Sequence, residues 1–250
     1  MQASQMFDLS GKRALITGGS SGLGRAIADA FQQAGAKVTI AGNRAEEVAS
    51  TAAELDLRGI HAVLGSRAAA ETLAEEVGPV DILVSNAGIE GPTGGVTGMD
   101  EADYMRVFDV NLHTSIWLSA ALAPAMAAAG GGSVILMASL SALRGNRMIT
   151  TYSMTKAALA QLARNLAVEF GPMNVRANAI APGLIETEFS VGLIRNEAFI
   201  ARRLQATPLR RVGQPHEIAA TALWLAGPGG AFVTGQTIVV DGGTLIHDGS

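Results

Sequence analysis

Short apolar segments alternate with longer amphipathic segments along nearly the whole chain. The short segments are rich in β-branched residues, and several are apolar at every position, as expected for strands that are covered on both faces. The predicted strands cover residues 13–17, 37–41, 60–64, 80–85, 133–138, 175–180 and 237–240.

The longer segments have helical periodicity and predict helices over residues 22–35, 45–57, 68–77, 100–129, 152–170 and 215–225. Strands that alternate with helices form βαβ units with right-handed crossovers. We therefore expect an α/β fold, a Rossmann-like doubly wound parallel sheet of seven strands in the order 3-2-1-4-5-6-7, flanked by helices. No linker or repeat divides the chain, so a single domain over residues 1–250 is expected.

Composition excludes several kinds of site. The chain has no Cys, which removes thiolate nucleophiles, disulfides and Cys-ligated metals, and no metal site is predicted. The net charge is −4 and the 18 Lys and Arg residues are scattered, whereas a nucleic-acid surface needs a concentrated basic stripe. A small-molecule partner is expected instead.

Two segments bear on membrane insertion and export. Residues 1–13 contain no apolar run and carry an acidic residue before the first basic one, so no signal peptide is predicted and a cytoplasmic location is expected. Residues 110–143 lack charges, but Pro124 and the glycines at 130–132 interrupt the segment before it reaches the roughly 20 residues that span a bilayer. A buried helix followed by a buried strand is predicted there.

A glycine-rich turn joins the first predicted strand to the first predicted helix. Such a turn brings backbone N–H groups, and the positive end of the helix dipole, against a pyrophosphate. The turn predicts nucleotide binding by Gly18, Ser20, Ser21, Gly22, Leu23 and Gly24. The spacing Gly-x-x-x-Gly-x-Gly differs from the common Gly-x-Gly-x-x-Gly fingerprint and resembles that of the short-chain dehydrogenase/reductase family.

Further segments carry the same resemblance. The fourth strand ends in a segment similar to the family's Asn-Asn-Ala-Gly, with Ser85 in the first place, followed by Asn86, Ala87 and Gly88 beside the expected cofactor. After the sixth strand, a Pro-Gly turn resembles the one that contacts the nicotinamide in this family. It contains Pro182, Gly183, Ile185 and Thr187.

The end of the second strand bears on cofactor choice. A carboxylate there would bind the adenosine ribose and repel a 2′-phosphate, but the chain has Gly42, Asn43 and Arg44. Asn43 and Arg44 are therefore predicted to contact the nucleotide, with NADP(H) favoured and NAD(H) possible. After the third strand, Gly65 and Ser66 stand where the family usually has an Asp near the adenine.

Ser139, Tyr152 and Lys156 have the Ser-x12-Tyr-x3-Lys spacing that is the family's catalytic signature. On a helix, positions four apart share one face, so the phenol and the ammonium are expected to lie together. An ammonium about 5 Å away at an effective dielectric of about 20 would lower the pKa of the phenol by roughly two units. The resemblance also implies that Asn111 holds a water that links Lys156 to solvent.

Residues 188–212 match the position of the family's substrate lid, and the apolar residues in this segment favour a largely hydrophobic substrate. Its arginines, Arg195, Arg202 and Arg203, are interpreted as a solvated face in preference to an anion site. The predicted substrate contacts are Ser139, Leu140, Met148, Tyr152 and Leu184, and further wall candidates are Glu90, Gly91, Ala142, Leu143 and Arg144.

The resemblance implies an oxidoreductase that transfers a hydride between NADP(H) or NAD(H) and a small, largely apolar ketone or secondary alcohol. Two alternatives stay open: a 3-oxoacyl thioester reductase, and a non-catalytic dinucleotide-binding protein. An enoyl reductase of related fold usually has six residues between Tyr and Lys, and this chain has three. The resemblance and the low charge of helices 100–129 and 152–170 also predict a homotetramer.

Overall fold

The computed structural model describes residues 2–247 and contains a seven-stranded parallel sheet in the order β3-β2-β1-β4-β5-β6-β7, which confirms the predicted order. The strands are β1 (Arg13–Thr17), β2 (Lys37–Gly42), β3 (Arg58–His61), β4 (Ile82–Ser85), β5 (Gly132–Met137), β6 (Val175–Pro182) and β7 (Thr237–Val240). The helices are α1 (Gly22–Gln33), α2 (Ala45–Glu54), α3 (Arg67–Val77), α4 (Glu101–Phe108), α5 (Thr114–Ala128), α6 (Thr150–Phe170), α7 (Val191–Ile194), α8 (Glu197–Gln205) and α9 (Pro215–Ala226).

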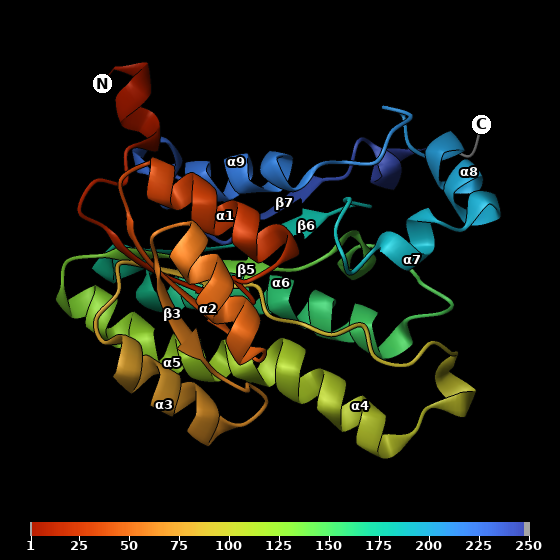
Figure 1. Cartoon of the computed structure of the whole chain (residues 1–250), viewed down its shortest axis with the longest axis horizontal. Helices are drawn as coiled ribbons and strands as arrows, with labels where there is room; N and C mark the ends of the chain where they lie inside the picture. Colours follow the sequence, from red (N-terminus) through yellow and green to blue (C-terminus); the bar gives the residue numbers. More distant parts are fainter. Residues whose placement is uncertain (1, 248–250) are drawn as a thin grey trace.

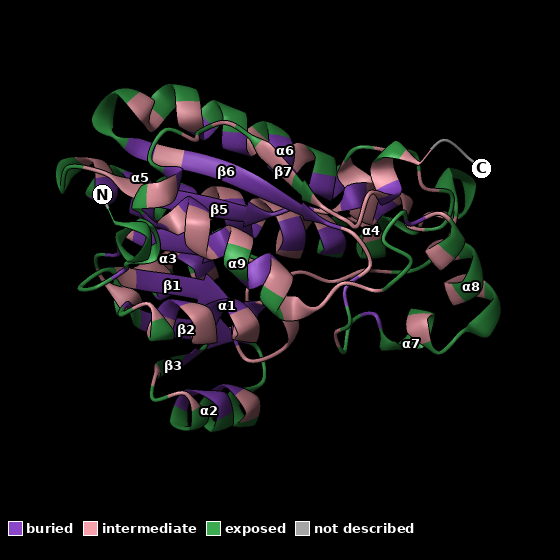
Figure 2. Ribbon diagram, turned by 90° about the horizontal axis from the view of Figure 1, so that it is seen from above, coloured by how far each residue is buried: buried purple, intermediate pink, exposed green. Residues whose placement is uncertain are grey.

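Helices cover both faces of the sheet. α1 and α9 run along one face, whereas α3 and α5 lie along the other (Figure 1). In β1, Ala14 and Ile16 pack into the core beneath α1 and α9, whereas Leu15 packs into the core beneath α3, α5 and α6. The continuous apolar pattern of the strands therefore supplies two cores, and the sheet is buried between its helices (Figure 2).

One predicted helix is divided into two. Residues 100–129 were predicted as a single helix, but α4 and α5 are separated by a π-helical turn at Asp109–His113. This turn contains Asn111, which is completely buried and bonded to a neighbouring loop. A π-helical turn inserts an extra residue and often marks a functional site, and the apolar pattern of the segment gives no sign of it.

The third strand begins and ends earlier than predicted, at Arg58–His61 instead of 60–64. Pairing with β2 runs from Thr39 opposite Arg58 to Gly42 opposite His61, so β2 ends where β3 ends. Val63 is exposed beyond this point. The apolar run was misleading because it continues into the loop at the carboxyl edge of the sheet.

The segment between β6 and α9 leaves the layers at one end. α7 and α8 extend beyond the carboxyl ends of the strands and are mostly exposed (Figures 1 and 2). Neither helix was predicted separately. Of the helices in residues 2–247, none has both the length and the apolar character needed to span a bilayer.

Candidate active site

A cleft of about 970 Å³ opens at the carboxyl ends of the strands. Its walls come from the loops after β1, β2, β3, β4, β5 and β6. Most of the residues predicted to bind cofactor or substrate line this cleft. They are Gly18, Ser20, Ser21, Gly22, Leu23, Asn43, Arg44, Asn86, Ala87, Gly88, Ser139, Leu140, Tyr152, Lys156, Pro182, Gly183, Leu184, Ile185 and Thr187.

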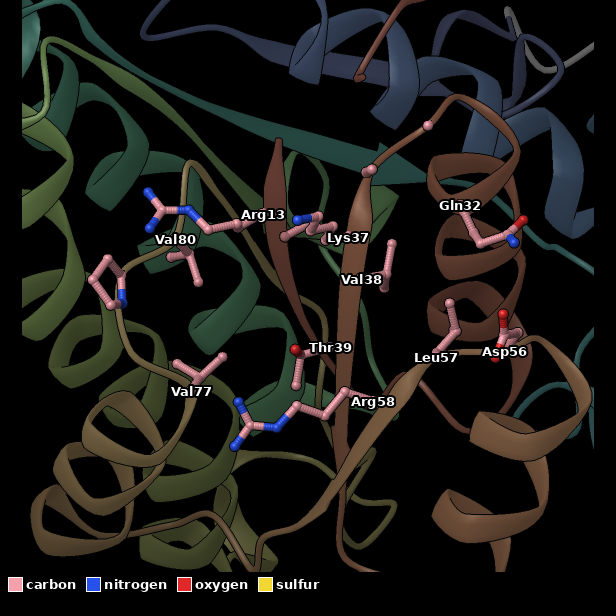
Figure 3. A pocket seen from close by; sticks show the side chains of 14 residues that line it. Arg13, Gln32, Lys37, Val38, Thr39, Asp56, Leu57, Arg58, Val77 and Val80 are labelled. Carbon is pink, nitrogen blue, oxygen red and sulfur yellow. The ribbon is translucent and has the colours of Figure 1, made fainter. Parts of the chain in front are cut away.

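A second hollow, of about 550 Å³, lies at the opposite edge of the sheet (Figure 3). Arg13, Lys37 and Arg58 surround the amino ends of β1, β2 and β3 there. Arg13 forms an ion pair with Asp81 at 3.0 Å, and Arg58 donates to the carbonyl of Glu76. None of the sequence motifs reaches this hollow, so the carboxyl-edge cleft is the candidate active site.

Thr17 joins the two turns on the nucleotide side of the cleft. Its buried hydroxyl accepts hydrogen bonds from the backbone N–H groups of Asn86 and Ala87, both at 3.0 Å. The Asn86 amide in turn donates to the carbonyls of Thr17 and Gly18, at 3.0 and 3.2 Å. These bonds fix the loop after β4 against the glycine-rich turn, a role for Thr17 that the sequence motif did not reveal.

Gly24 was predicted to bind the cofactor, but it does not line the cleft. It packs against the glycine-rich turn instead. A Cβ at Gly24 would lie 2.0 Å from the carbonyl oxygen of Gly18 and 2.7 Å from the amide nitrogen of Asn86. Helix α1 can approach the turn only because this position has no side chain. The contact of Gly24 is therefore with the turn and not with a ligand in the cleft.

The structure fits a nucleotide phosphate at the start of α1. Ser21 is the N-cap of this 12-residue helix, yet its side chain makes no capping hydrogen bond. The N–H groups of a first turn have no partner within the helix, and they favour an anion. Gly22 and Leu23 belong to this first turn and line the cleft.

Arg44 lies at the end of β2 and forms ion pairs with Glu47 and, at 3.8 Å, with Glu188. All three side chains are exposed, so each pair contributes little stability. A Cβ at Gly42 would lie 2.9 Å from Val48 Cγ2. A carboxylate at position 42 would therefore displace Val48.

Ser66, where the family usually has an Asp, serves a helix. Its hydroxyl accepts from the N–H of Ala69 at 3.2 Å and caps α3. Gly65 precedes it with φ of 138° and lines the cleft. The loop after β3 would therefore contact an adenine through backbone atoms, because neither Gly65 nor Ser66 supplies a carboxylate.

Ser139, Tyr152 and Lys156 meet where β5 and α6 approach each other. Ser139 follows β5, and its hydroxyl accepts from the N–H of Ser141 at 3.1 Å. Lys156 donates to the carbonyl of Met137 at 2.8 Å, and its ammonium lies 5.4 Å from the centre of the Tyr152 ring. The predicted proximity of the three side chains is confirmed.

The predicted lowering of the Tyr152 pKa by Lys156 is wrong. Burial, opposed by a hydrogen bond with Ser139 and assisted by the carboxylate of Glu90, raises the pKa of Tyr152 to about 12. Burial lowers the pKa of Lys156 to about 8. Desolvation disfavours both charged forms and outweighs the attraction that was expected between them.

Asn111 lies behind the cleft rather than in its wall. Its amide oxygen accepts from the N–H of Ile89 at 2.7 Å, and its amide nitrogen donates to the carbonyl of Ile89 at 2.8 Å and to Thr155 Oγ1 at 3.3 Å. Gly88 is held closely, because a Cβ there would lie 3.2 Å from Asn111 Oδ1 and 3.4 Å from Lys156 Nζ. Asn111 therefore joins the π-helical turn, the loop after β4 and α6.

The segment after β6 is closed at its base by a β-bridge, and near its end Leu209 donates to the carbonyl of Gly242 and Thr207 bonds to Thr244 at 2.9 Å. Ile185 pairs with Gly213, with backbone hydrogen bonds from Glu186 to Gly213 and from Gly213 to Leu184. Residues 186–212 between these points, which we call the excursion, contain α7 and α8 and lie beside the cleft. Phe189, near its start, places its ring 6.2 Å from the ring of Tyr152.

Met148 was predicted to contact substrate but does not line the cleft, and its side chain is 51% exposed. Its neighbours Asn146 and Ile149 line the cleft instead. Of the further wall candidates, Glu90 and Arg144 line the cleft, whereas Gly91, Ala142 and Leu143 do not. The sequence gave no signal for several other lining residues, among them Val63, Leu64, Ala102, Met105 and Arg106.

A family model described as enoyl-(acyl carrier protein) reductase matches residues 18–244. The chain belongs to the short-chain dehydrogenase/reductase family. The proposed resemblance is thereby confirmed over nearly the whole chain. The description of the family model names a reductase of a carbon–carbon double bond, whereas the curated relatives include dehydrogenases of alcohols, among them a 7alpha-hydroxysteroid dehydrogenase and a galactitol 2-dehydrogenase.

Three of these similarities are informative. The 7alpha-hydroxysteroid dehydrogenase of Escherichia coli K12 is 38% identical over 244 residues, 94% of each chain. A solved structure of a 7α-hydroxysteroid dehydrogenase with NADH and 7-oxo glycochenodeoxycholic acid is 37% identical, has a TM-score of 0.91, and aligns over 97% of this chain and 98% of that one. A gluconate 5-dehydrogenase from Burkholderia cenocepacia with NADP and tartrate is 33% identical, with a TM-score of 0.89 and coverage of 97% and 98%. Relatives of this short-chain dehydrogenase/reductase thus bind either nucleotide.

Proposed function

We propose that this chain is an NAD(P)-dependent alcohol dehydrogenase or carbonyl reductase that acts on a small ketone or secondary alcohol with an apolar body. The observation that carries the proposal is the meeting of Ser139, Tyr152 and Lys156 in the cleft that also contains the glycine-rich turn. Leu140, Ile149, Leu184, Phe189 and Leu193 supply apolar wall around these groups.

A bound nicotinamide would supply the hydride in reduction and accept it in oxidation. In reduction, Tyr152 donates its proton to the substrate oxygen as the carbonyl carbon gains the hydride, and Ser139 donates a hydrogen bond to the same oxygen. The raised pKa of Tyr152 keeps the phenol protonated and ready to donate at neutral pH. A charged Lys156 would stabilise the phenolate relative to a neutral side chain at this position and would bind the nicotinamide ribose, while Asn111 positions the loop after β4.

NADP(H) is the favoured nucleotide and NAD(H) an acceptable one. Arg44 offers a guanidinium at the end of β2, and Gly42 offers no carboxylate that would repel a 2′-phosphate. Asn43 and Arg44 would hold the adenosine ribose or its phosphate, and Pro182, Gly183, Ile185 and Thr187 the nicotinamide. Relatives with NADP and with NADH agree with use of either nucleotide.

The proposal also covers the domain, the lid, the oligomeric state and the location of the protein. Residues 1–250 act as one catalytic domain, and residues 188–212, which include α7 and α8, act as a lid that closes over substrate. Exposed small and apolar side chains on α5 and α6, such as Pro124, Ala125 and Val168, suit pairing with a second copy of the chain in a homotetramer. A cytoplasmic location goes with this function.

Reduction of a 3-oxoacyl thioester is the second candidate. It is favoured by a solved structure described as a putative betaketoacyl-ACP reductase, which is 39% identical with a TM-score of 0.88 over 96% of this chain and 100% of that one. The chemistry at Tyr152 would be the same, so only the substrate distinguishes the two proposals. A purely nucleotide-binding role gives no reason for a buried lysine beside a buried phenol.

The test is a panel of ketones, secondary alcohols and acetoacetyl thioester assayed with NADPH and NADH, using the chain and two variants. Tyr152→Phe should lose about 10³-fold or more in turnover and still bind the nucleotide. Tyr104→Phe is the matched control, because Tyr104 is the other of the two tyrosines and packs against Phe108 outside the catalytic cluster. Undiminished turnover in Tyr152→Phe would refute the mechanism, and turnover of thioesters alone would select the second candidate.

A further inference from the structure

Two arginines face the substrate half of the cleft from separate elements. Arg144 follows the short 3₁₀ helix Leu140–Ala142 that begins at Ser139, whereas Arg203 is on α8 in the excursion after β6. Both line the cleft that contains Tyr152, and both are partly buried. The sequence-based interpretation of Arg203 as part of a solvated face is therefore not supported, although Arg195 and Arg202 are exposed.

Neither arginine forms an ion pair in residues 2–247, although the Asp241 carboxylate attracts Arg203 from beyond ion-pair distance. Within residues 2–247, neither guanidinium has a carboxylate at ion-pair distance or a hydrogen bond to a protein acceptor. The guanidinium carbon of Arg203 lies 5.6 Å from the centre of the Phe199 ring, one helical turn away. A partly buried cation without a hydrogen-bonded acceptor favours an anionic ligand.

The two guanidinium groups also act on each other. Burial and the charge of Arg144 lower the pKa of Arg203, while Asp241 opposes this effect. The Asp241 carboxylate is already bonded to the N–H groups of Gly243 and Leu245, at 2.8 and 2.6 Å. Glu90, the other acidic group near Tyr152, has its pKa raised by burial with no opposing contribution from either arginine. The substrate half of the cleft is therefore lined by two cations whose charges repel each other.

We propose that Arg144 and Arg203 together bind a carboxylate of the substrate, so that the natural substrate is an oxo acid or hydroxy acid with an apolar body. This rests on the proposed function, which places the reacting carbon at Tyr152. Because Arg203 belongs to the excursion and Arg144 to the body of the protein, a carboxylate bound by both would also draw α8 toward the catalytic groups. Binding of the acid end and closure of the lid are then one event.

The experiment uses a series of oxo acids with increasing carbon spacing between ketone and carboxylate, each paired with its neutral methyl ester. The chain should prefer at least one oxo acid over its ester by a factor of about ten or more in kcat/KM. Arg144→Ala and Arg203→Ala should each raise the KM for that acid by roughly tenfold, with little change in kcat, in the KM for the ester or in the KM for NADPH. A non-reacting carboxylate of similar shape should inhibit the chain competitively and the variants weakly.

Two neighbouring arginines give matched controls. Arg147→Ala, three residues after Arg144, and Arg202→Ala, beside Arg203 on α8, remove exposed guanidinium groups that do not line the cleft, and both should leave the preference unchanged. Equal turnover of acids and esters would overturn the carboxylate proposal while the dehydrogenase proposal stands. Absence of turnover with every ketone, neutral or anionic, would instead refute the proposed function. A preference for acetoacetyl thioester over all oxo acids would also overturn carboxylate binding.

Discussion

The ammonium nitrogen of Lys156 lies 5.4 Å from the centre of the Tyr152 ring and donates to the carbonyl of Met137. Lys156 is 3% exposed, so its charge is removed from water and is held by one neutral acceptor. Burial accordingly lowers its pKa from 10.5 to about 8. If Lys156 acts as proposed, its charge would stabilise the phenolate during the reaction at the expense of the stability of the resting fold.

Lys156→Met should therefore stabilise the protein while abolishing turnover. A shift of this size corresponds to about 3 kcal/mol at pH 7, and loss of the hydrogen bond to Met137 should reduce the net gain to roughly 1–3 kcal/mol. Urea unfolding of the chain and of Lys156→Met measures the difference in their free energies of unfolding. Because the unfolded chain binds more protons between about pH 8 and 10.5, the gap between the chain and the variant should narrow as pH rises through this window.

Lys37→Met is the control for this substitution, because Lys37 is exposed at the start of β2. It should change neither stability nor turnover appreciably. A Lys156→Met protein that unfolds at lower urea than the unmodified chain at pH 7 would contradict the account of Lys156.

The two reaction directions should depend on pH in opposite ways. Reduction needs a protonated Tyr152, whose pKa is about 12, and a charged Lys156, whose pKa is about 8, so kcat/KM should be level below pH 8 and decline above it. Oxidation needs the phenolate and should rise with pH through the neutral range. Initial rates of nicotinamide absorbance change between pH 6 and 10 give both profiles. Reduction that accelerates between pH 7 and 9 would be incompatible with these pKa directions.

Arg44 and Glu188 should have opposite effects on the nucleotide preference. Arg44→Ala should weaken NADPH binding about tenfold and leave NADH binding nearly unchanged, since only NADPH carries the 2′-phosphate. Glu188→Gln removes the carboxylate 3.8 Å from Arg44 and should favour NADPH by a few-fold. Fluorescence titration with both nucleotides measures this. If Arg44→Ala weakens the binding of NADPH and of NADH equally, Arg44 does not contact the 2′-phosphate.

Gly24→Ala should disrupt the nucleotide end of the cleft through sterics alone. The new Cβ would lie 2.0 Å from the Gly18 carbonyl oxygen, so α1 or the turn must move. We expect a loss of stability of about 1–3 kcal/mol and weaker binding of both nucleotides. Gly192→Ala on α7 is the control, because nothing lies within 4 Å of its Cβ. Normal nucleotide binding by Gly24→Ala would show that the turn is more adaptable than its contacts imply.

The strands, the helices and most of the cleft could be predicted from local sequence patterns. The strand order followed from the way that βαβ units connect. Residues such as Leu15 and Ile16 are both apolar because each faces a helical layer, and the motifs follow strands whose carboxyl ends share one edge of the sheet. The position of Tyr152 near Lys156 follows from helical spacing alone.

Other features depend on contacts between distant segments. The π-helical turn at Asn111 is fixed by hydrogen bonds to Ile89, 22 residues away, which leave no trace in the periodicity. The pKa values of Tyr152 and Lys156 depend on burial, which spacing does not provide. Met148 was predicted to contact substrate because it is near the catalytic groups in sequence. In the folded loop, Asn146 and Ile149 line the cleft and Met148 does not.

The bridge between Ile185 and Gly213 has a consequence for how this enzyme can change. Residues 186–206, between this bridge and the buried hydrogen bond that joins Thr207 to Thr244, therefore form an exchangeable cassette. Its length costs little in loop-closure entropy once the base is paired. Shortening, lengthening or replacing the cassette should therefore alter which molecules are admitted while β6, α9 and the proton-transferring groups keep their places.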